Sequence, residues 1–338
     1  MADALRVVAG GGDLSLEEAE GAVGALLSGE GSEALCAAFL TALRMKGESA
    51  DELAGAVRAV RAGVVDAGLR RPATSLLDTC GTGGDGAHTV NVSTAAAVVV
   101  AACGVAVAKH GNRSASGNSG SAEVLAELGI NIDADVDVLN RCLEELGITF
   151  LYAPKFHPGL RAIAGVRKQL PYRTLFNLVG PLANPARPDF QLVGVAGKGR
   201  GDLVAGALAR LGTKRAAVVT GADGLDEVSL AGATRVLVVE GGAIVEREWV
   251  AADFGLGPAP LAELRVSGPS DSAARICHLF AGEPGAVRET VLANAAAALW
   301  VAGERDLRDG AARAAEAVDS GRAGRLLEKW REVSQGRD

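Results

Sequence analysis

The stretch from Asp78 to Leu128, DTCGTGGDGAHTVNVSTAAAVVVAACGVAVAKHGNRSASGNSGSAEVLAEL, decides the fold. Two glycine- and hydroxyl-rich loops, Gly81–Thr94 and Lys109–Ser121, flank one apolar run, Ala95–Ala108. Each loop precedes residues that can begin a helix, so it presents backbone N–H groups and the positive end of a helix dipole to an anion. Lys109 and Arg113 add fixed cations to the second loop. Two such loops predict a ligand that carries more than one phosphate.

Each pattern also has an ordinary structural interpretation. The glycine cluster 81–86 is neither a Walker A loop nor a dinucleotide fingerprint, and such clusters are most often tight turns. The pentad Lys109–Arg113 could be a solvated surface loop. Their joint occurrence favours a phosphate site, because folding does not require two anion-binding loops around one buried run.

Composition limits the class of protein. The chain has 338 residues, 49% of them hydrophobic and 22% charged, which is typical of a globular protein. A net charge of −7 argues against nucleic-acid binding through bulk charge, so an anionic substrate needs a locally basic pocket or a divalent cation. The five cysteines are scattered without metal-ligand spacing, which fits buried thiols. With no signal-like or membrane-length apolar run, we expect a soluble cytoplasmic protein.

Residues 1–70 have the pattern of a helical unit. Ser15–Glu18 and Ser49–Glu52 match capping boxes, and Ser32 and Gly47 should begin and end a helix over 33–46. The apolar stripes of these helices suit a dimer interface, although a bundle within one chain would show the same pattern.

From about residue 74 the chain alternates between strands and helices. Strands are expected at 75–79, 104–108, 149–152, 191–195 and 216–220, with helices between them. This alternation predicts an α/β domain over 71–338 with a mostly parallel central sheet, in which ligands bind at the carboxyl ends of the strands. A hairpin over 234–250 and a mostly helical segment from 270 follow.

Three further charged residues are candidates for binding. Asp226 and Glu227 follow an expected strand and are either solvated turn residues or oxygen ligands for Mg²⁺. Arg167 lies among apolar residues of an expected helix, so it should point partly inward and need an anionic partner. The pattern does not decide between a protein carboxylate and a substrate carboxylate.

In motif order and spacing the chain resembles the anthranilate phosphoribosyltransferases of tryptophan biosynthesis over nearly its whole length. The resemblance is carried by GTGGDGxxTxNxST at 81–94, KHGNR at 109–113, SGxSGSA at 116–122, HPxxR…VR at 157–167, RTxFNxxGPLxNP at 173–185 and DGxDE at 223–227. It implies a nucleoside phosphorylase-like fold, in which a small helical domain over 1–70, joined by part of 158–185, sits on a large α/β domain. It also implies a homodimer formed through the helical domain.

The family reaction implies two substrates and one cofactor. The substrates are 5-phosphoribosyl-1-pyrophosphate (PRPP) and anthranilate, and the cofactor is Mg²⁺. By resemblance, PRPP would bind at Gly81, Thr82, Gly83, Gly84, Asp85, Thr89, Asn91, Ser93, Thr94, Lys109, Asn112, Arg113 and Ser121. Anthranilate would bind at Gly81, His110, Asn112, His157, Arg167 and Pro181, and Mg²⁺ at Ser93, Asp226 and Glu227. Glu123 departs from the family pattern, which generally has Asp at this position.

The motifs leave some alternatives open. No general base is obvious: His110 could serve, but a hydrogen-bonded structural histidine fits equally well. A pyrimidine nucleoside phosphorylase of the same fold is a second hypothesis, disfavoured because it needs no metal pair for pyrophosphate. A catalytically silent, nucleic-acid-binding relative is a third, disfavoured by the acidic balance and the intact loops.

Overall fold

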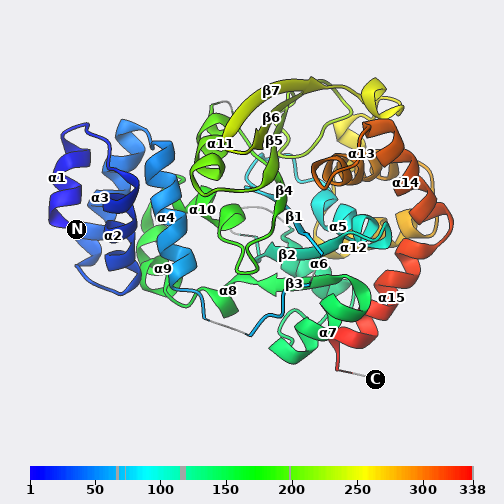
Figure 1. Cartoon of the computed structure of the whole chain (residues 1–338), viewed down its shortest axis with the longest axis horizontal. Helices are drawn as coiled ribbons and strands as arrows, with labels where there is room; N and C mark the ends of the chain where they lie inside the picture. Colours follow the sequence, from blue (N-terminus) through cyan, green and yellow to red (C-terminus); the bar gives the residue numbers. More distant parts are fainter. Residues whose placement is uncertain (66–67, 73, 115–118, 198, 337–338) are drawn as a thin grey trace.

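The computed structural model describes residues 1–65, 68–72, 74–114, 119–197 and 199–336. Its N-terminal part is a bundle of four helices, drawn in blue in Figure 1: α1 (Ala2–Ala9), α2 (Leu16–Leu27), α3 (Glu33–Lys46) and α4 (Ala50–Ala62). Ser15–Glu18 and Ser49–Glu52 both form capping boxes, and α3 begins after Ser32 and ends at Gly47 with a φ of 88°, as the sequence predicted.

Two later helices pack against this bundle. They are α9 (Leu160–Gln169), whose buried Ile163 and Val166 join the apolar cluster of the bundle, and α10 (Phe176–Leu182). The segment after Asn177 is rich in helix breakers, yet α10 continues to Leu182 with Pro181 in its last turn. Proline is tolerated here because only the end of the helix loses a hydrogen bond.

The centre of the molecule is one seven-stranded sheet in the order β3-β2-β1-β4-β5-β6-β7. The first five strands in this order run parallel, and β5, β6 and β7 are antiparallel, so the expected mostly parallel sheet with a terminal hairpin is confirmed. The strands are β1 (Leu76–Gly81), β2 (Ala106–Gly111), β3 (Ile148–Tyr152), β4 (Phe190–Gly194), β5 (Arg215–Gly221), β6 (Thr234–Glu240) and β7 (Ala243–Trp249).

Helices cover both faces of the sheet (Figure 1). Val193 and Val218 face the cluster shared with the helical bundle, whereas their neighbours Leu192 and Val219 face the opposite cluster, as the two-residue period of a strand requires. The remaining helices are α5 (Val92–Ala102), α6 (Ser121–Glu127), α7 (Val136–Leu146), α8 (Ala153–Phe156), α11 (Arg200–Arg210), α12 (Pro269–Phe280), α13 (Ala286–Val301), α14 (Leu307–Asp319) and α15 (Arg322–Ser334), with short 3₁₀ turns η1 (Ala251–Phe254) and η2 (Leu261–Leu264).

The second glycine-rich loop starts later than expected. Lys109 and His110 are residues of β2 and pair with β3, so both are held on the sheet and not in a loop. Both side chains are buried, with 2% and 6% of their surfaces exposed. Among the described residues, no helix is long and apolar enough to cross a membrane.

Candidate active site

Glycines end the two central strands where they meet. Gly81 of β1 pairs with Gly194 of β4, and the backbone of Asp226 passes directly over this pair. A Cβ on Gly194 would lie 1.6 Å from the carbonyl oxygen of Asp226, and one on Gly81 would lie 2.5 Å from its carboxylate. Only glycine therefore lets the loop after β5 reach the carboxyl ends of β1 and β4.

The first loop is fixed by partners that are remote in sequence. The amide of Thr82 donates to the carbonyl of Gly194 at 2.9 Å, and the amide of Gly83 donates to Asp226 Oδ2 at 2.6 Å. Arg173 donates to the carbonyls of Thr82 and Gly83. The next amides, at 84–86, donate to no acceptor within the described part of the chain, so they are available to an anion.

Asp226 and Glu227 form a crowded carboxylate pair beside this loop. Burial, with the nearby Asp85 carboxylate, raises the pKa of Asp226 to about 7. Burial and the charge of Asp226 raise the pKa of Glu227 to about 8. Glu227 also accepts a hydrogen bond from the amide of Ser93, in the first turn of α5, at 3.1 Å. Two carboxylates that repel each other in a buried place are stabilised by a cation.

The residues present fit magnesium only together with a ligand. Nowhere among the described residues do three or more His, Cys, Asp or Glu side chains gather as a metal site. Mg²⁺ is commonly held by one or two carboxylates, with substrate phosphates and water completing its shell. Asp226, Glu227 and the hydroxyl of Ser93 match that incomplete donor set.

Lys109 reaches the same place from β2. Its Nζ donates to the carbonyl of Thr79 at 2.6 Å and to Ser93 Oγ at 3.3 Å. Burial lowers the pKa of Lys109, and the charges of Asp78 and Glu227 oppose that effect. The structure thus brings Ser93, Lys109 and Glu227 together.

A buried aspartate that sequence reasoning missed supports this centre. Asp78 accepts hydrogen bonds from the amide of His110 at 3.2 Å and from Asn184 Nδ2 at 2.9 Å. Burial raises the pKa of Asp78 to about 6. Because Asn184 also donates to the carbonyl of Ala108, it ties β1 and β2 together next to Lys109. The signal for Asp78 in the sequence was a charged residue within an otherwise apolar expected strand.

The second loop is held mainly by its own helix. The carboxylate of Glu123, in α6, accepts from the amides of Ser114 and Gly120. Asn91 is the remote anchor: its Oδ1 accepts from Ser119 Oγ at 2.7 Å and from Ser272 Oγ at 2.9 Å. The longer Glu123 side chain therefore fits as a cap. The part of the expected loop at 115–118 lies outside the described residues.

The other predicted donor-site residues differ in exposure. Asn112 and Arg113 are exposed, and Arg113 Nε donates to the hydroxyl of Tyr152 at 3.2 Å. Thr89 forms an isolated bridge with Arg265, and the side chain of Thr94 is buried. Ser121 is half-buried, and its hydroxyl donates to the carbonyl of Asn112 at 3.4 Å.

The two predicted histidines are in contact. Their Nε2 atoms are 3.2 Å apart, and His110 Nδ1 lies 3.2 Å from the carbonyl oxygen of Gly180. Burial lowers the pKa of His110 to about 3, with a smaller contribution from His157, and burial lowers the pKa of His157 to about 4. Both rings are therefore neutral at pH 7. Since Nδ1 of His110 faces a carbonyl, it carries the hydrogen, and Nε2 accepts one from His157. This arrangement favours a hydrogen-bonded structural role for His110 over that of a base.

Arg167 has an aromatic neighbour. Its guanidinium carbon lies 5.6 Å from the ring centre of Phe176, and burial lowers its pKa. It forms no ion pair with any residue the structure describes. The buried Pro181 lies beside Gly180 and thus next to the histidine pair, whereas no hydrogen bond within the described part of the chain joins Arg167 or Asn112 to that pair. The protein-carboxylate alternative for Arg167 therefore has no support within this part of the chain.

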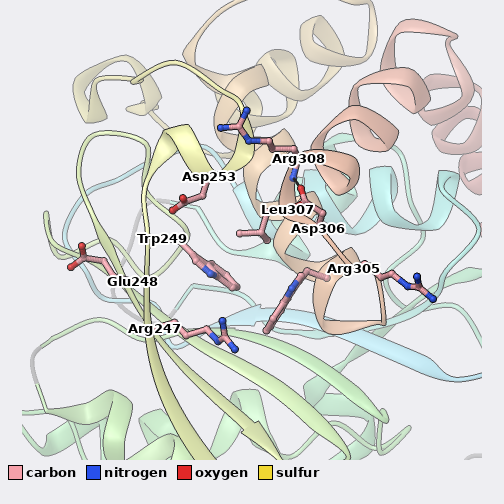
Figure 2. A pocket seen from close by; sticks show the side chains of 9 residues that line it. Arg247, Glu248, Trp249, Asp253, Arg305, Asp306, Leu307 and Arg308 are labelled. Atoms are coloured by element: carbon pink, nitrogen blue, oxygen red, sulfur yellow. Dashed lines mark hydrogen bonds between the residues drawn. The ribbon is translucent and has the colours of Figure 1, made fainter.

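A separate hollow of about 550 Å³ lies between β7, η1 and the start of α14 (Figure 2). Figure 2 shows Glu248 and Arg305 pointing away from each other on opposite sides of Trp249. The lining residues are Arg247, Glu248, Trp249, Asp253, Trp300, Arg305, Asp306, Leu307 and Arg308, with equal numbers of acidic and basic side chains. None belongs to the sequence motifs, and their charges do not converge.

Comparison with known proteins agrees with the geometry. The helical bundle domain of a glycosyl transferase family matches residues 2–63, and the a/b domain of that family matches residues 73–324. The anthranilate phosphoribosyltransferase of Symbiobacterium thermophilum is 46% identical over 332 residues, which cover 98% of this chain and 96% of the relative.

Solved structures give the same result. The anthranilate phosphoribosyltransferase of Thermus thermophilus superposes with a TM-score of 0.91 at 41% identity, covering 98% of this chain and 99% of the other. The enzyme of Saccharomyces cerevisiae in complex with PRPP and Mg superposes with a TM-score of 0.87 at 28% identity, covering 96% and 94%. With both domains matched and relatives spanning almost its full length, the chain belongs to the anthranilate phosphoribosyltransferase family.

Proposed function

We propose that the carboxyl edge of the sheet is where this chain performs the reaction of its family. The chain transfers the phosphoribosyl group of PRPP to the amine of anthranilate, giving N-(5-phosphoribosyl)anthranilate and pyrophosphate, a step of tryptophan biosynthesis. The bond from ribose C1 to the diphosphate oxygen breaks, a bond from C1 to nitrogen forms, and the nitrogen loses a proton. The crowded pair of Asp226 and Glu227, placed between the first loop and Lys109, is the observation that carries the proposal.

The donor side neutralises the departing diphosphate. The free amides at 84–86 donate to its oxygens, and Lys109 supplies a fixed charge. Mg²⁺ is the cofactor, held by Ser93, Asp226 and Glu227, and when bound it offsets the negative charge of the leaving group. The remaining residues proposed to contact PRPP are Gly81, Thr82, Gly83, Thr89, Asn91, Thr94, Asn112, Arg113 and Ser121.

The acceptor side orients the aromatic amine. Arg167, which has no protein carboxylate for a partner among the described residues, binds the anthranilate carboxylate. The neutral histidine pair, Pro181, Gly81 and Asn112 line the remaining surface. Because the amine is already nucleophilic, its placement supplies most of what the acceptor needs.

The direct test is release of pyrophosphate from PRPP. We expect release that depends on both anthranilate and Mg²⁺, and no release of free base when a pyrimidine nucleoside and phosphate replace the two substrates. Arg167→Ala should raise the anthranilate KM about 30-fold or more, because a charge-assisted contact to the carboxylate is lost, with little change in the PRPP KM. An unchanged anthranilate KM would remove Arg167 from the acceptor site.

We further propose that two chains associate through the helical domain. Val7 of α1 and Met45 of α3 are 39% and 82% exposed, which leaves apolar surface on helices that pack on each other. Sedimentation should give twice the chain mass, and Met45→Glu should shift the protein toward the monomer. We also propose residues 1–70, joined by part of 158–185, as the helical domain, 71–338 as the α/β domain, and a cytoplasmic location, which suits five free cysteines.

A further inference from the structure

Arg173 is not among the residues proposed to contact either substrate. It lies in the short connection between α9, which carries Arg167, and α10. Its guanidinium reaches the α/β domain and forms two hydrogen bonds with the first loop. Nη1 donates to the carbonyl of Gly83 at 2.5 Å, and Nη2 donates to the carbonyl of Thr82 at 2.8 Å. The planar fork of an arginine holds two successive carbonyls in one fixed geometry, whereas a lysine carries rotatable donors on a flexible stem and holds them less rigidly.

These two bonds complete the fixing of the loop backbone. Thr82 and Gly83 now have both their amides and their carbonyls engaged, by Gly194, Asp226 and Arg173. The next three amides, at 84–86, are the ones without an acceptor in the described chain. The orientation of those free donors therefore depends on how firmly the two preceding peptide units are held.

Gly84 shows how closely the guanidinium approaches. A Cβ at this position would lie 2.0 Å from Arg173 Nη1, so any side chain would displace the arginine. Gly84 also has a φ of 74°, which favours glycine independently. Arg173 can therefore occupy this position only if residue 84, which lies 89 positions earlier in the sequence, is glycine.

We propose that Arg173 is a positioning residue that holds the first loop in its diphosphate-binding shape. It does so through the carbonyls of Thr82 and Gly83 and touches no substrate itself. This inference rests on the proposed function of the loop. Because Arg173 comes from the segment that packs on the helical bundle, it also fixes the loop relative to that bundle.

The experiment measures binding of pyrophosphate with Mg²⁺ by calorimetry, together with steady-state kinetics, on the full chain. Arg173→Ala should weaken pyrophosphate binding and raise the PRPP KM by about tenfold or more, the size expected when charge-assisted hydrogen bonds that organise a loop are lost. The anthranilate KM should change less than about threefold, since no acceptor contact is removed. Arg173→Lys should recover only part of the loss.

Lys168→Ala is the matched control, because it removes one exposed positive charge from the same helical segment. It should bind pyrophosphate as the unaltered chain does. Pyrophosphate binding by Arg173→Ala equal to that of the unaltered chain would overturn the positioning role and leave the proposed function intact. Failure of the unaltered chain to bind pyrophosphate with Mg²⁺ would overturn the proposed function, and the inference with it.

A second comparison keeps the test decisive if Arg173→Ala does not fold. Gly84→Ala places a methyl group where the guanidinium lies and also strains a backbone with a φ of 74°, so it should weaken pyrophosphate binding at least as much as Arg173→Ala does. Where both variants fold, adding Gly84→Ala to Arg173→Ala should cost less than adding it to the unaltered chain. Fully additive losses would contradict the proposed contact.

Discussion

The two glycine-rich loops are alike in sequence and differ in what holds them. The first, at 81–86, is fixed by Gly194, Asp226 and Arg173, which belong to three different parts of the chain. The second is closed by Glu123, which lies only three residues after Gly120. Among the described residues, its remote ties are Asn91, which links Ser119 to α12, and Tyr152, whose hydroxyl accepts from Arg113.

This difference shows which contacts determine the conformation of each loop. The first loop acquires its shape only when the whole fold is assembled, because its partners come from β4, the loop after β5 and the segment before α10. Glu123 fixes the described C-terminal end of the second loop locally, as a helix cap does. A change at a partner of the first loop should therefore act at a distance, whereas a change at Glu123 should act on its own loop.

The largest effect is expected from removing the carboxylate pair of the first loop. Asp226→Ala with Glu227→Ala deletes the proposed metal ligands and the acceptor for the Gly83 amide. We expect kcat/KM to fall by about 1,000-fold or more, because charge stabilisation of the leaving group is worth several kcal/mol. The dependence of turnover on Mg²⁺ concentration should disappear together with the activity.

The control for this change is Glu248→Gln. It removes an exposed carboxylate from the separate hollow in Figure 2 and should leave kcat/KM as it is. A double variant at 226 and 227 that kept normal magnesium dependence would place the metal elsewhere.

A smaller effect is expected from loosening the second loop. Glu123→Gln keeps the size of the side chain but weakens the two hydrogen bonds that this side chain accepts from the backbone amides of Ser114 and Gly120. We expect the PRPP KM to rise about tenfold, since a cap of this kind is worth about 1 kcal/mol or somewhat more when charged. Glu123→Asp, one methylene shorter, should show whether the longer residue is needed to span Ser114 and Gly120.

The effect of Glu123→Gln on the PRPP KM tests whether the second loop depends on this one side chain. A loss of kcat/KM in Glu123→Gln equal to that of the Asp226→Ala, Glu227→Ala variant would mean that the second loop is as important for activity as the carboxylate pair. A PRPP KM unchanged by Glu123→Gln would mean that the Asn91 tie is sufficient to hold the second loop.

Sequence reasoning reached much of the fold because its signals are local. The capping boxes at Ser15 and Ser49 and the left-handed glycine at 47 act within one helix turn, and the strand periodicity acts within each strand. The mostly parallel sheet and the carboxylate pair at the end of β5 followed from the order of the elements.

The contacts that sequence reasoning missed all join distant segments. Arg173 on the Thr82 and Gly83 carbonyls and Asn184 on Asp78 give no periodic signal in the chain. The limits of β2 were also missed, because KHG at 109–111 has the composition of a loop, yet its backbone pairs with β3. Tertiary context overrides composition at these positions.

The smallest expected effect is a change of stability with pH that comes mainly from the carboxylate pair beside the first loop. The folded pKa values of Asp226 and Glu227 lie near 7 and 8, well above the ordinary values of 3.8 and 4.5. Between pH 7 and 8.5 the folded chain therefore holds protons that the unfolded chain has already lost. The free energy of unfolding should then fall as pH rises, by about 1 kcal/mol per pH unit.

Denaturant unfolding without metal across this pH range measures the slope. Asp226→Asn with Glu227→Gln should remove most of it, because neither side chain can then ionise, whereas Glu123→Gln should retain it. Mg²⁺ with pyrophosphate should also remove the slope, since the ligand binds the ionised pair and compensates its charge. An unchanged pH slope of the unfolding free energy in the Asp226→Asn, Glu227→Gln variant would show that other groups cause it. The pKa values of Asp226 and Glu227 would then not be raised by burial.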